Sequence, residues 1–419
     1  MELNTEIMEM ARRAKAASLK LGLISTAEKN RALTMMAQAL ISKSGYIIAQ
    51  NKKDLTEAQR QNYAKVLMDR LVLNEKRIKE MSDSLLETAK LKDPVGEVLS
   101  AFKRPNGLLI KKVRVPIGVI GIVYESRPNV TSDCVGLCVK SGNAVILKGG
   151  REAVFSNRAI FKVLRDALEK TQVPFEAIQL ISSIDRKAVE ILLSLEGHVD
   201  LIIPRGGEAL IRFVADHSRI PVIKHYKGVC HTYVSDHADL AMAYDICMNA
   251  KVQRPGVCNA METLLVDKKI ANKFLPDMLT GLRKAGVEIR GCPRTRAVVK
   301  DGVKKAVEQD WKEEYLDLIL SVKVVDNLKQ AISHINTYGT KHSDTIVTKD
   351  KAQAEEFLKA VDSACVYVNA STRFTDGYQF GFGAEVGIST DKIHARGPMA
   401  LEELTTYKYL ILGQGQIRQ

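Results

Sequence analysis

The fold of this chain is decided by one short stretch, Val145-Ile146-Leu147-Lys148-Gly149-Gly150. Its apolar run does not alternate with polar residues, which predicts a strand buried on both faces. The Lys and the two glycines mark the end of that strand, before a helical pattern at 153–169. Further unalternating runs occur at 119–123, 178–181, 199–203 and 221–223, with helical patterns at 185–195 and 208–215 between them. Strands that alternate with helices predict a parallel, doubly wound α/β sheet, which binds ligands at the carboxyl ends of its strands.

A second α/β series begins near residue 230. Apolar runs at 263–266, 287–290, 319–325, 345–347 and 364–368 alternate with helical patterns at 271–285, 326–337 and 351–360. The stretch 369–398 is rich in Gly, Ser, Thr and Asp, which is typical of loops. The chain therefore contains two α/β regions in succession.

The first hundred residues have a helical pattern instead. Ser25-x-x-Glu28 is a capping-box pattern, and an apolar face follows it at helical spacing, formed by Leu33, Met36, Ala37, Leu40 and Ile41. Beyond them, a Pro105-Asn106-Gly107 turn between apolar and basic residues predicts a β-hairpin at 102–115. The strand-like tail at 404–412 could pair with this hairpin or with another subunit.

The composition limits the class of protein. Of 419 residues, 46% are apolar and 26% charged, as in ordinary soluble proteins. The sequence has no apolar run of the roughly 18 residues that a membrane span requires, and its N-terminus lacks an apolar signal region. The seven cysteines are an odd number in a long chain, so we expect free thiols and a reducing cytoplasm.

The net charge of +13 has two interpretations. It could indicate nucleic acid binding, but the basic residues are dispersed and do not alternate with aromatic residues, which are only 5% of the chain. An excess of positive charge also suits an enzyme whose substrate and cofactor are both anionic. We expect the second class, with no nucleic acid partner.

One cysteine has the surroundings of a reactive thiol. Cys258 lies in the Pro/Gly loop Gln253-Arg254-Pro255-Gly256-Val257-Cys258-Asn259-Ala260, directly before the strand-like run 264–266. A thiol on a loop beside a rigid strand can meet a substrate. The alternative is that Cys258 is a small buried packing residue, as most free cysteines are.

Two strand–Gly-Gly–helix junctions are candidates for a nucleotide site. One is Lys148-Gly149-Gly150 and the other is Arg205-Gly206-Gly207, since glycines let a ligand approach the backbone at a helix N-terminus. Either could instead be an ordinary turn that needs small residues. The dinucleotide fingerprint, the P-loop and the zinc-protease motif are all missing from the sequence. Four histidines at 217, 225, 231 and 237, with Cys230 among them, match no standard zinc spacing, so we expect no metal site.

Taken together, these motifs resemble the aldehyde dehydrogenase superfamily. The matching stretches, in order, are 115–121, 141–148 and the Cys258 loop. Four further stretches resemble the branch of that superfamily that reduces γ-glutamyl phosphate: 124–131, 253–260, 368–377 and 394–398. The resemblance covers essentially the whole chain. It implies NADPH-dependent reduction of γ-glutamyl phosphate to glutamate 5-semialdehyde with release of phosphate, the second step of proline biosynthesis.

The resemblance also implies roles for individual residues. Cys258 would attack the acyl phosphate and carry a thioacyl group, and Asn129 is the candidate oxyanion donor, although ungapped alignment places Glu125 there. Hydrolytic relatives carry a general-base Glu where this chain has Lys224-His225-Tyr226-Lys227-Gly228. When hydride or phosphate attacks the thioester, no base is needed to activate water. We therefore expect His225→Ala to retain substantial activity.

For the cofactor, Lys148 matches the superfamily lysine that holds the adenosine ribose. Arg151 replaces an acid and would favour the 2′-phosphate of NADPH. Glu314 resembles the glutamate that holds the nicotinamide ribose, and the 205–207 junction is the further candidate.

The head group of the substrate carries a carboxylate and an ammonium. Charge matching assigns Ser371, Thr372 and Arg373 to the carboxylate and Asp376 or Glu125 to the ammonium. Arg127, in the 124–131 motif, is a further candidate substrate residue.

The domain organisation follows from the same resemblance. We expect a cofactor-binding domain at 1–97 and 115–228, a catalytic domain at 229–399, and an oligomerisation arm at 98–114 and 400–419. The arm predicts a homodimer or higher homo-oligomer, and a glutamate 5-kinase is a candidate docking partner because the acyl phosphate is labile. The rival interpretations are a reductase of coenzyme A thioesters or of N-acetylglutamyl phosphate, and a non-catalytic member of the fold.

Overall fold

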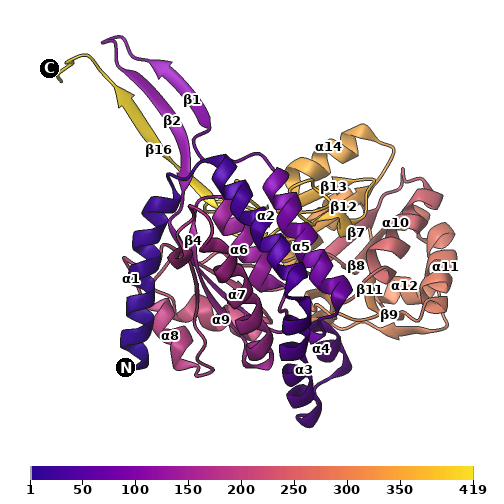
Figure 1. Ribbon diagram of the computed structural model, residues 1–419. Coiled ribbons are helices and arrows are strands. Elements are labelled where there is room, and N and C mark those ends of the chain that lie inside the picture. The colour runs from indigo at the N-terminus through magenta and orange to yellow at the C-terminus, as the bar shows by residue number, and fades with distance from the viewer. Residues whose placement is uncertain (1, 419) are drawn as a thin grey trace. The chain divides into compact units, whose positions relative to one another are not determined.

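The computed structural model describes residues 2–418, which form two units (Figure 1). Of these residues, unit 1 contains 2–224, 381–387 and 398–418, and unit 2 contains 225–380 and 388–397. The division falls between Lys224 and His225. Each unit is built on its own sheet.

Unit 1 has a four-stranded sheet with the order β5-β4-β3-β6, and all its neighbouring strands are parallel. The strands are β3 (Val119–Tyr124), β4 (Ala144–Gly149), β5 (Ile178–Leu180) and β6 (Leu201–Arg205). The helices are α1 (Leu3–Leu21), α2 (Thr26–Ser42), α3 (Ser44–Arg60), α4 (Lys65–Leu71), α5 (Glu75–Lys90), α6 (Val130–Lys140), α7 (Val154–Leu168), α8 (Lys187–Leu193) and α9 (Glu208–His217), with short 3-10 turns η1 (Arg151–Ala153) and η2 (Phe175–Ala177). The stretch that decides the fold is β4, which pairs with β3 and β5 and is buried until its last residue.

Unit 2 has a seven-stranded, fully parallel sheet with the order β10-β9-β11-β8-β7-β12-β13. Its strands are β7 (Cys230–Val234), β8 (Met261–Asp267), β9 (Glu288–Gly291), β10 (Val303–Lys305), β11 (Ile319–Val325), β12 (Ser343–Val347) and β13 (Cys365–Val368). Its helices are α10 (Leu240–Val252), α11 (Lys268–Lys284), α12 (Pro293–Val298), α13 (Leu328–Tyr338) and α14 (Lys351–Ala360), with 3-10 turns η3 (Glu308–Lys312) and η4 (Thr372–Phe374). The short strands β14 (Gly387–Ser389) and β15 (Gly397–Met399) form a separate pair. The predicted doubly wound α/β fold is therefore confirmed.

A three-stranded arm belongs to unit 1. The strand order is β1 (Val98–Lys103), β2 (Leu109–Pro116) and β16 (Thr405–Leu412), all antiparallel, and Figure 1 shows them extending as a long ribbon. The predicted hairpin thus forms, and the C-terminal strand pairs with β2 of the same chain. Tyr407, Tyr409 and Ile411 alternate along β16 and are exposed, which leaves an apolar strip on the arm.

Helix starts follow the capping chemistry of the sequence. The Ser25 Oγ accepts a hydrogen bond from the Glu28 N–H at 3.3 Å and begins α2, as the capping-box pattern predicts. Leu33, Met36, Ala37 and Leu40 of α2 are buried, whereas Ile41 is 46% exposed and does not belong to the apolar face that the sequence predicts. The predicted run at 221–223 contributes only an isolated bridge from Val222 to Ile202.

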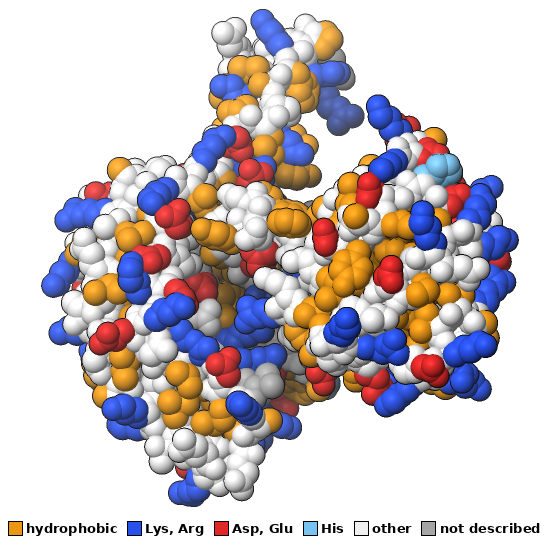
Figure 2. All heavy atoms as spheres, turned by 90° about the vertical axis from the view of Figure 1, so that its right-hand side faces the viewer, with side chains coloured by type: hydrophobic (Ala, Val, Ile, Leu, Met, Phe, Trp, Pro, Cys, Tyr) orange, Lys and Arg blue, Asp and Glu red, His pale blue; other side chains and the backbone are white. Residues whose placement is uncertain are grey.

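Two surface properties bear on the class of protein. Among the helices of the described residues, none is both long and apolar enough to cross a membrane. Figure 2 shows Lys and Arg side chains scattered over the visible face and interspersed with Asp and Glu. This view shows no continuous basic strip of the kind that tracks a nucleic acid backbone.

Candidate active site

Cys258 lies on a turn between α10 and β8, at the amino-terminal edge of the unit 2 sheet. Its side chain is partly exposed, whereas the other six cysteines are buried. Burial raises the pKa of the Cys230 and Cys247 thiols far above the usual range, so these thiols stay protonated. Cys258 is therefore the cysteine whose thiol a substrate can reach.

A buried ion pair links the two ends of the Cys258 turn. Lys251 Nζ, at the end of α10, lies 2.6 Å from Glu262 Oε2, at the start of β8, and neither side chain is exposed. Burial raises the pKa of Glu262 and lowers that of Lys251. Because the pair joins both flanks, it fixes where the turn leaves the helix and enters the strand.

A second set of contacts joins three loops around the turn. The Gly228 backbone approaches Cys258 so closely that a Cβ there would lie 1.8 Å from the Cys258 carbonyl oxygen. The Gly228 N–H donates to Glu314 Oε1 at 2.8 Å, and the Leu316 N–H donates to Glu262 Oε1 at 3.2 Å. Glu314, the predicted ribose residue, thus accepts a hydrogen bond from Gly228, whose backbone packs against Cys258.

Two imidazoles flank the thiol. His225, His342 and Cys258 each offer one ligand atom, and these atoms lie within 4.8 Å of one another. His225 precedes β7 and His342 precedes β12, so all three residues enter the sheet at its amino-terminal edge. Strands β8, β7 and β12 are neighbours in the sheet, and this order brings the three segments together.

The predicted carboxylate-binding residues lie beside the same turn. Thr372 Oγ1 donates to the Asn259 carbonyl at 2.7 Å, and Arg373 Nε donates to Gln253 Oε1 at 2.8 Å. Ser371 Oγ accepts from the Arg373 N–H at 3.3 Å and begins η4. Ser371 and Thr372 are buried, so their hydroxyls mainly hold η4 against the turn, and the partly exposed Arg373 is the side chain that a substrate carboxylate can meet.

Asp376 is the fourth predicted residue of this segment. Its Oδ1 accepts from the Tyr378 and Gln379 N–H groups at 2.9 and 3.2 Å. Asp376 remains partly exposed, so it keeps the capacity to meet an ammonium group.

Two arginines act on each other at the Cys258 turn, and the carboxylate of Asp376 partly opposes their effect. Burial lowers the pKa of Arg373, and the guanidinium of Arg254 lowers it further. Two like charges are therefore held close together beside Cys258. Such a pair favours an anion between them, because the anion relieves their repulsion.

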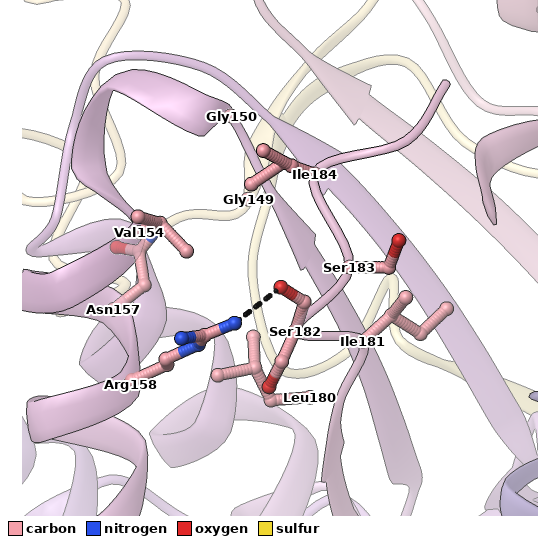
Figure 3. Close-up of a pocket in the computed structure, with 10 residues that line it drawn as sticks. All are labelled: Gly149, Gly150, Val154, Asn157, Arg158, Leu180, Ile181, Ser182, Ser183 and Ile184. Atoms are coloured by element: carbon pink, nitrogen blue, oxygen red, sulfur yellow. Dashed lines mark hydrogen bonds between the residues drawn. The ribbon is translucent and has the colours of Figure 1, made fainter. Parts of the chain in front are cut away.

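Unit 1 carries the predicted cofactor residues at the carboxyl ends of its strands. Lys148, near the end of β4, is buried and donates from Nζ to the Gly149 carbonyl at 2.8 Å. Desolvation lowers the pKa of Lys148. Beside it, a shallow pocket that is open to solvent lies between β4, α7 and the end of β5 (Figure 3).

The lining of this pocket contains four apolar residues, four polar residues and two glycines. Its residues are Gly149, Gly150, Val154, Asn157, Arg158, Leu180, Ile181, Ser182, Ser183 and Ile184. Figure 3 shows Arg158 reaching across from α7, where its Nη2 donates to the Ser182 carbonyl at 2.9 Å. Arg158 lines the pocket, whereas the predicted Arg151 lies outside its lining, exposed in η1.

The Gly206-Gly207 junction is arranged differently from the expectation. It follows β6 and precedes α9, as the pattern predicts, but the Gly207 N–H donates to Glu125 Oε2 at 2.9 Å. The protein's own carboxylate therefore lies at the helix N-terminus, where a phosphate would otherwise be attracted. Arg205 ends β6, and its guanidinium reaches the backbone at Gly387.

Asn129 and Arg127 lie on the turn between β3 and α6, and both are exposed. Asn129 Nδ2 donates one hydrogen bond to Asp133 Oδ2 at 3.0 Å, and an amide nitrogen carries two protons. Ser126, on the same turn, has a positive φ of 51°, and its N–H donates to the Glu152 carboxylate. Glu152 thus holds the turn that presents both residues.

Sequence reasoning missed two features of the site. Arg158 and the Ser182-Ser183 pair carry no motif, although Ser182 follows a predicted strand directly and could have been found by that position. His342 has no sequence signal, because its approach to Cys258 depends on strand order. The structure also places Cys258 at the amino-terminal edge of its sheet, not at the carboxyl edge where such sheets usually bind ligands.

Comparison with known proteins establishes the class. The model of the aldehyde dehydrogenase family matches residues 3–297 and 293–410, so the chain belongs to the aldehyde dehydrogenase family and is an enzyme of that family. The resemblance predicted from the motifs is thereby confirmed.

Its full-length relatives are more specific. The gamma-glutamyl phosphate reductase of Caldanaerobacter subterraneus subsp. tengcongensis is 57% identical over 414 residues, which are 99% of this chain and 100% of the relative. The crystal structure of gamma-glutamyl phosphate reductase from Thermotoga maritima has a TM-score of 0.97 at 48% identity, covering 99% of this chain and 100% of that one. A glyceraldehyde-3-phosphate dehydrogenase from Methanocaldococcus jannaschii, solved in complex with NADP, has a TM-score of 0.68 at 16% identity, covering 98% of this chain and 95% of that one, and shares the fold alone.

Proposed function

We propose that this chain reduces γ-glutamyl phosphate to glutamate 5-semialdehyde with NADPH and releases phosphate, as the second step of proline biosynthesis from glutamate. Similarity over the full length to proteins named for this reaction supports the substrate. The single structural observation that carries the chemistry is the partly exposed Cys258 thiol on its braced turn, with two guanidinium groups beside it.

The reaction begins with the thiol. Cys258 loses its proton, its sulfur attacks the acyl carbon, and the bond from that carbon to the phosphate oxygen breaks, so phosphate leaves and a thioacyl group remains. Arg254 and Arg373 suit this step because both the substrate carboxylate and the leaving phosphate are anions.

The second half returns the thiol. The thioacyl carbon would then take up a hydride, which is the chemistry that NADPH would supply when bound. The sulfur–carbon bond then breaks as the aldehyde carbonyl forms, and Cys258 regains a proton. Negative charge gathers on the same oxygen at both stages, and we assign its stabilisation to the Cys258 N–H and the Asn129 amide.

The surroundings of Cys258 also fit the absence of a hydrolytic step. The general-base glutamate of hydrolytic relatives is replaced by the Lys224–Gly228 segment, in which His225 Nδ1 is bonded to the Ile388 carbonyl at 2.7 Å. In an enzyme that passes its thioester to hydride, or in the reverse reaction to phosphate, the thioester is protected from hydrolysis when no base activates water. We therefore assign His225 no part in turnover.

The residues of unit 1 fit a dinucleotide. A Cβ at Gly149 would meet Asn157 Nδ2 at 2.2 Å, so a glycine lets the end of β4 and the Asn157 side chain of α7 lie this close beside the pocket. Apolar walls with serines and an arginine suit an adenosine whose ribose carries a 2′-phosphate. We assign Lys148 to the ribose, Arg158 together with the predicted Arg151 to the 2′-phosphate, and Glu314 to the second ribose.

The remaining predicted contacts have unequal support. Arg205, Gly206 and Gly207 stay candidates for the cofactor, but an anion there must compete with Glu125. That contact also makes Glu125 less available to the substrate ammonium than Asp376 is. Arg127 is exposed on the turn beside Asn129 and stays a candidate for the substrate.

The arm supports self-association. Its outer strands β1 and β16 expose apolar side chains, Phe102 and Ile411 among them, and unpaired strand edges invite a second copy. We propose a homo-oligomer joined through the arm. Docking of a glutamate 5-kinase stays a prediction.

Trapping the intermediate tests the mechanism. Enzyme mixed with glutamate 5-semialdehyde and NADP⁺ without phosphate should gain a glutamyl mass on the peptide that contains Cys258, measured by mass spectrometry. Cys258→Ser should gain none. Phosphate is then added to the same mixture. If the wild type turns over although no such adduct had formed beforehand, the thioacyl route is wrong.

A further inference from the structure

Three side chains at the candidate active site form a constellation, and the proposed reaction uses only one of them, the Cys258 thiol. One ligand atom each from Cys258, His225 and His342 lies within 4.8 Å of the other two. We propose that they form a reversible binding site for a soft divalent cation of the zinc class, and that its occupancy switches off the catalytic thiol. The inhibitory consequence rests on the proposed function, but the binding site itself does not.

The donor set selects the metal. One thiolate and two imidazoles are the ligands that Zn²⁺ and its neighbours prefer, whereas Mg²⁺ and Ca²⁺ prefer oxygen ligands. Three protein ligands leave the fourth tetrahedral position open to water or substrate. Metal binding releases the thiol proton to solvent, and no electron is transferred.

The geometry is close to what a tetrahedral ion needs. Ligand atoms about 2.0–2.3 Å from zinc lie about 3.3–3.8 Å from each other, so small side-chain rotations would close the constellation. His342 is fully buried and fixed, while His225 and Cys258 are partly exposed and leave a path of entry. All three residues precede neighbouring strands of one parallel sheet, so the sheet sets their backbone separation.

Both imidazoles have the partners that metal-bound histidines usually have. His225 Nδ1 lies 2.7 Å from the Ile388 carbonyl, which can only accept, so Nδ1 carries the proton and the lone pair is on Nε2. His342 Nδ1 lies 2.8 Å from Ser343 Oγ. These bonds orient the rings before any ion arrives, which lowers the cost of ordering them.

The binding test uses Co²⁺ as a visible substitute for zinc on the full chain, without substrate or added thiols. Wild type should show a sulfur-to-cobalt charge-transfer band in the near ultraviolet, and Zn²⁺ should displace it. Cys258→Ser should lack the band, because the other six thiols are buried. A band that persists in Cys258→Ser, or that is absent from the wild type, overturns the site.

The activity test distinguishes the effect of zinc binding from the catalytic reaction itself. Micromolar Zn²⁺ should inhibit the wild type, a chelator should restore the rate, and Mg²⁺ should have no effect. His225→Ala should retain turnover while its zinc affinity falls by at least about tenfold. The matched control is His237→Ala, an exposed histidine paired with Asp236 outside the constellation, and its zinc sensitivity should equal that of the wild type.

The outcomes are distinguishable. Equal zinc sensitivity in His225→Ala and the wild type overturns the proposal. If the cobalt band depends on Cys258 but turnover does not, the metal site is supported and the proposed catalytic mechanism is wrong.

Discussion

The buried ion pair between Lys251 and Glu262 gives the sharpest test of how the Cys258 turn is held. Lys251→Met removes one partner with little change of volume, and Glu262→Gln removes the other while keeping an oxygen for the Leu316 N–H. Each single variant leaves one buried group that has lost its opposite charge. The double variant leaves neither.

The structure sets the magnitudes. The two charges are 2.6 Å apart and neither side chain is exposed, so breaking the pair from either side should cost about 3–5 kcal/mol of unfolding free energy. Because burial raises the pKa of Glu262, that carboxyl can take up a proton when Lys251 is lost. Lys251→Met should therefore fall at the lower end of the range. The double variant should cost less than either single variant, with a coupling energy above about 2 kcal/mol.

Urea unfolding measures this directly. The single tryptophan, Trp311, is buried in unit 2, so its fluorescence reports on the unit that contains the pair. Lys268→Met with Asp326→Asn, a surface ion pair in the same unit as Trp311, is the matched control and should show coupling below about 0.5 kcal/mol. Additive costs at positions 251 and 262 would refute the reasoning that this pair is a mutually dependent brace.

Three further predictions follow from other parts of the structure. Arg158→Ala should raise the KM for NADPH by about ten- to a hundredfold and leave the KM for NADH nearly unchanged, whereas equal effects on both cofactors would contradict a 2′-phosphate contact. The pKa of Asp362 is held well below its usual range by Lys392, and then by Arg396 and Lys341. The stabilisation that these ion pairs give the fold is therefore complete above the ordinary pKa of 3.8, and it is lost as the pH falls through the depressed pKa of Asp362. Asp362→Asn should destabilise the 388–397 segment by about 0.5–1 kcal/mol at neutral pH, seen as faster tryptic cleavage there, and an unchanged rate would contradict the role of these ion pairs. Ile411→Lys should lower the particle mass measured by light scattering, and an unchanged mass would show that the arm is not the interface.

Much of the fold could be predicted because it is encoded locally. Unalternating apolar runs such as 145–147 indicate strands buried on both faces, and Pro105-Asn106-Gly107 indicates a tight turn. The exception at Ile41 is also physical. A helical pattern gives the spacing of a face but not where the neighbouring element ends, and Ile41 near the end of α2 remains exposed.

The site residues could be predicted only where the features that identify them are contiguous in the sequence. Cys258 was found because its turn and its strand are contiguous. His342 and Arg158 were not found, since their positions depend on the order β8-β7-β12 and on how α7 packs beside β5. Glu125 shows the same limit, because a Gly-Gly junction in sequence does not reveal that the chain's own carboxylate lies at the helix N-terminus.

The most direct test runs the reaction backwards. Glutamate 5-semialdehyde and NADP⁺ are mixed with the enzyme, with and without phosphate, and NADPH absorbance is followed. Phosphate-dependent NADPH formation in the wild type, reduced by on the order of 10³-fold or more in Cys258→Ser, is the predicted result. Sustained formation without phosphate, or a substantial rate in Cys258→Ser, would contradict a Cys258 thioester that is passed to phosphate.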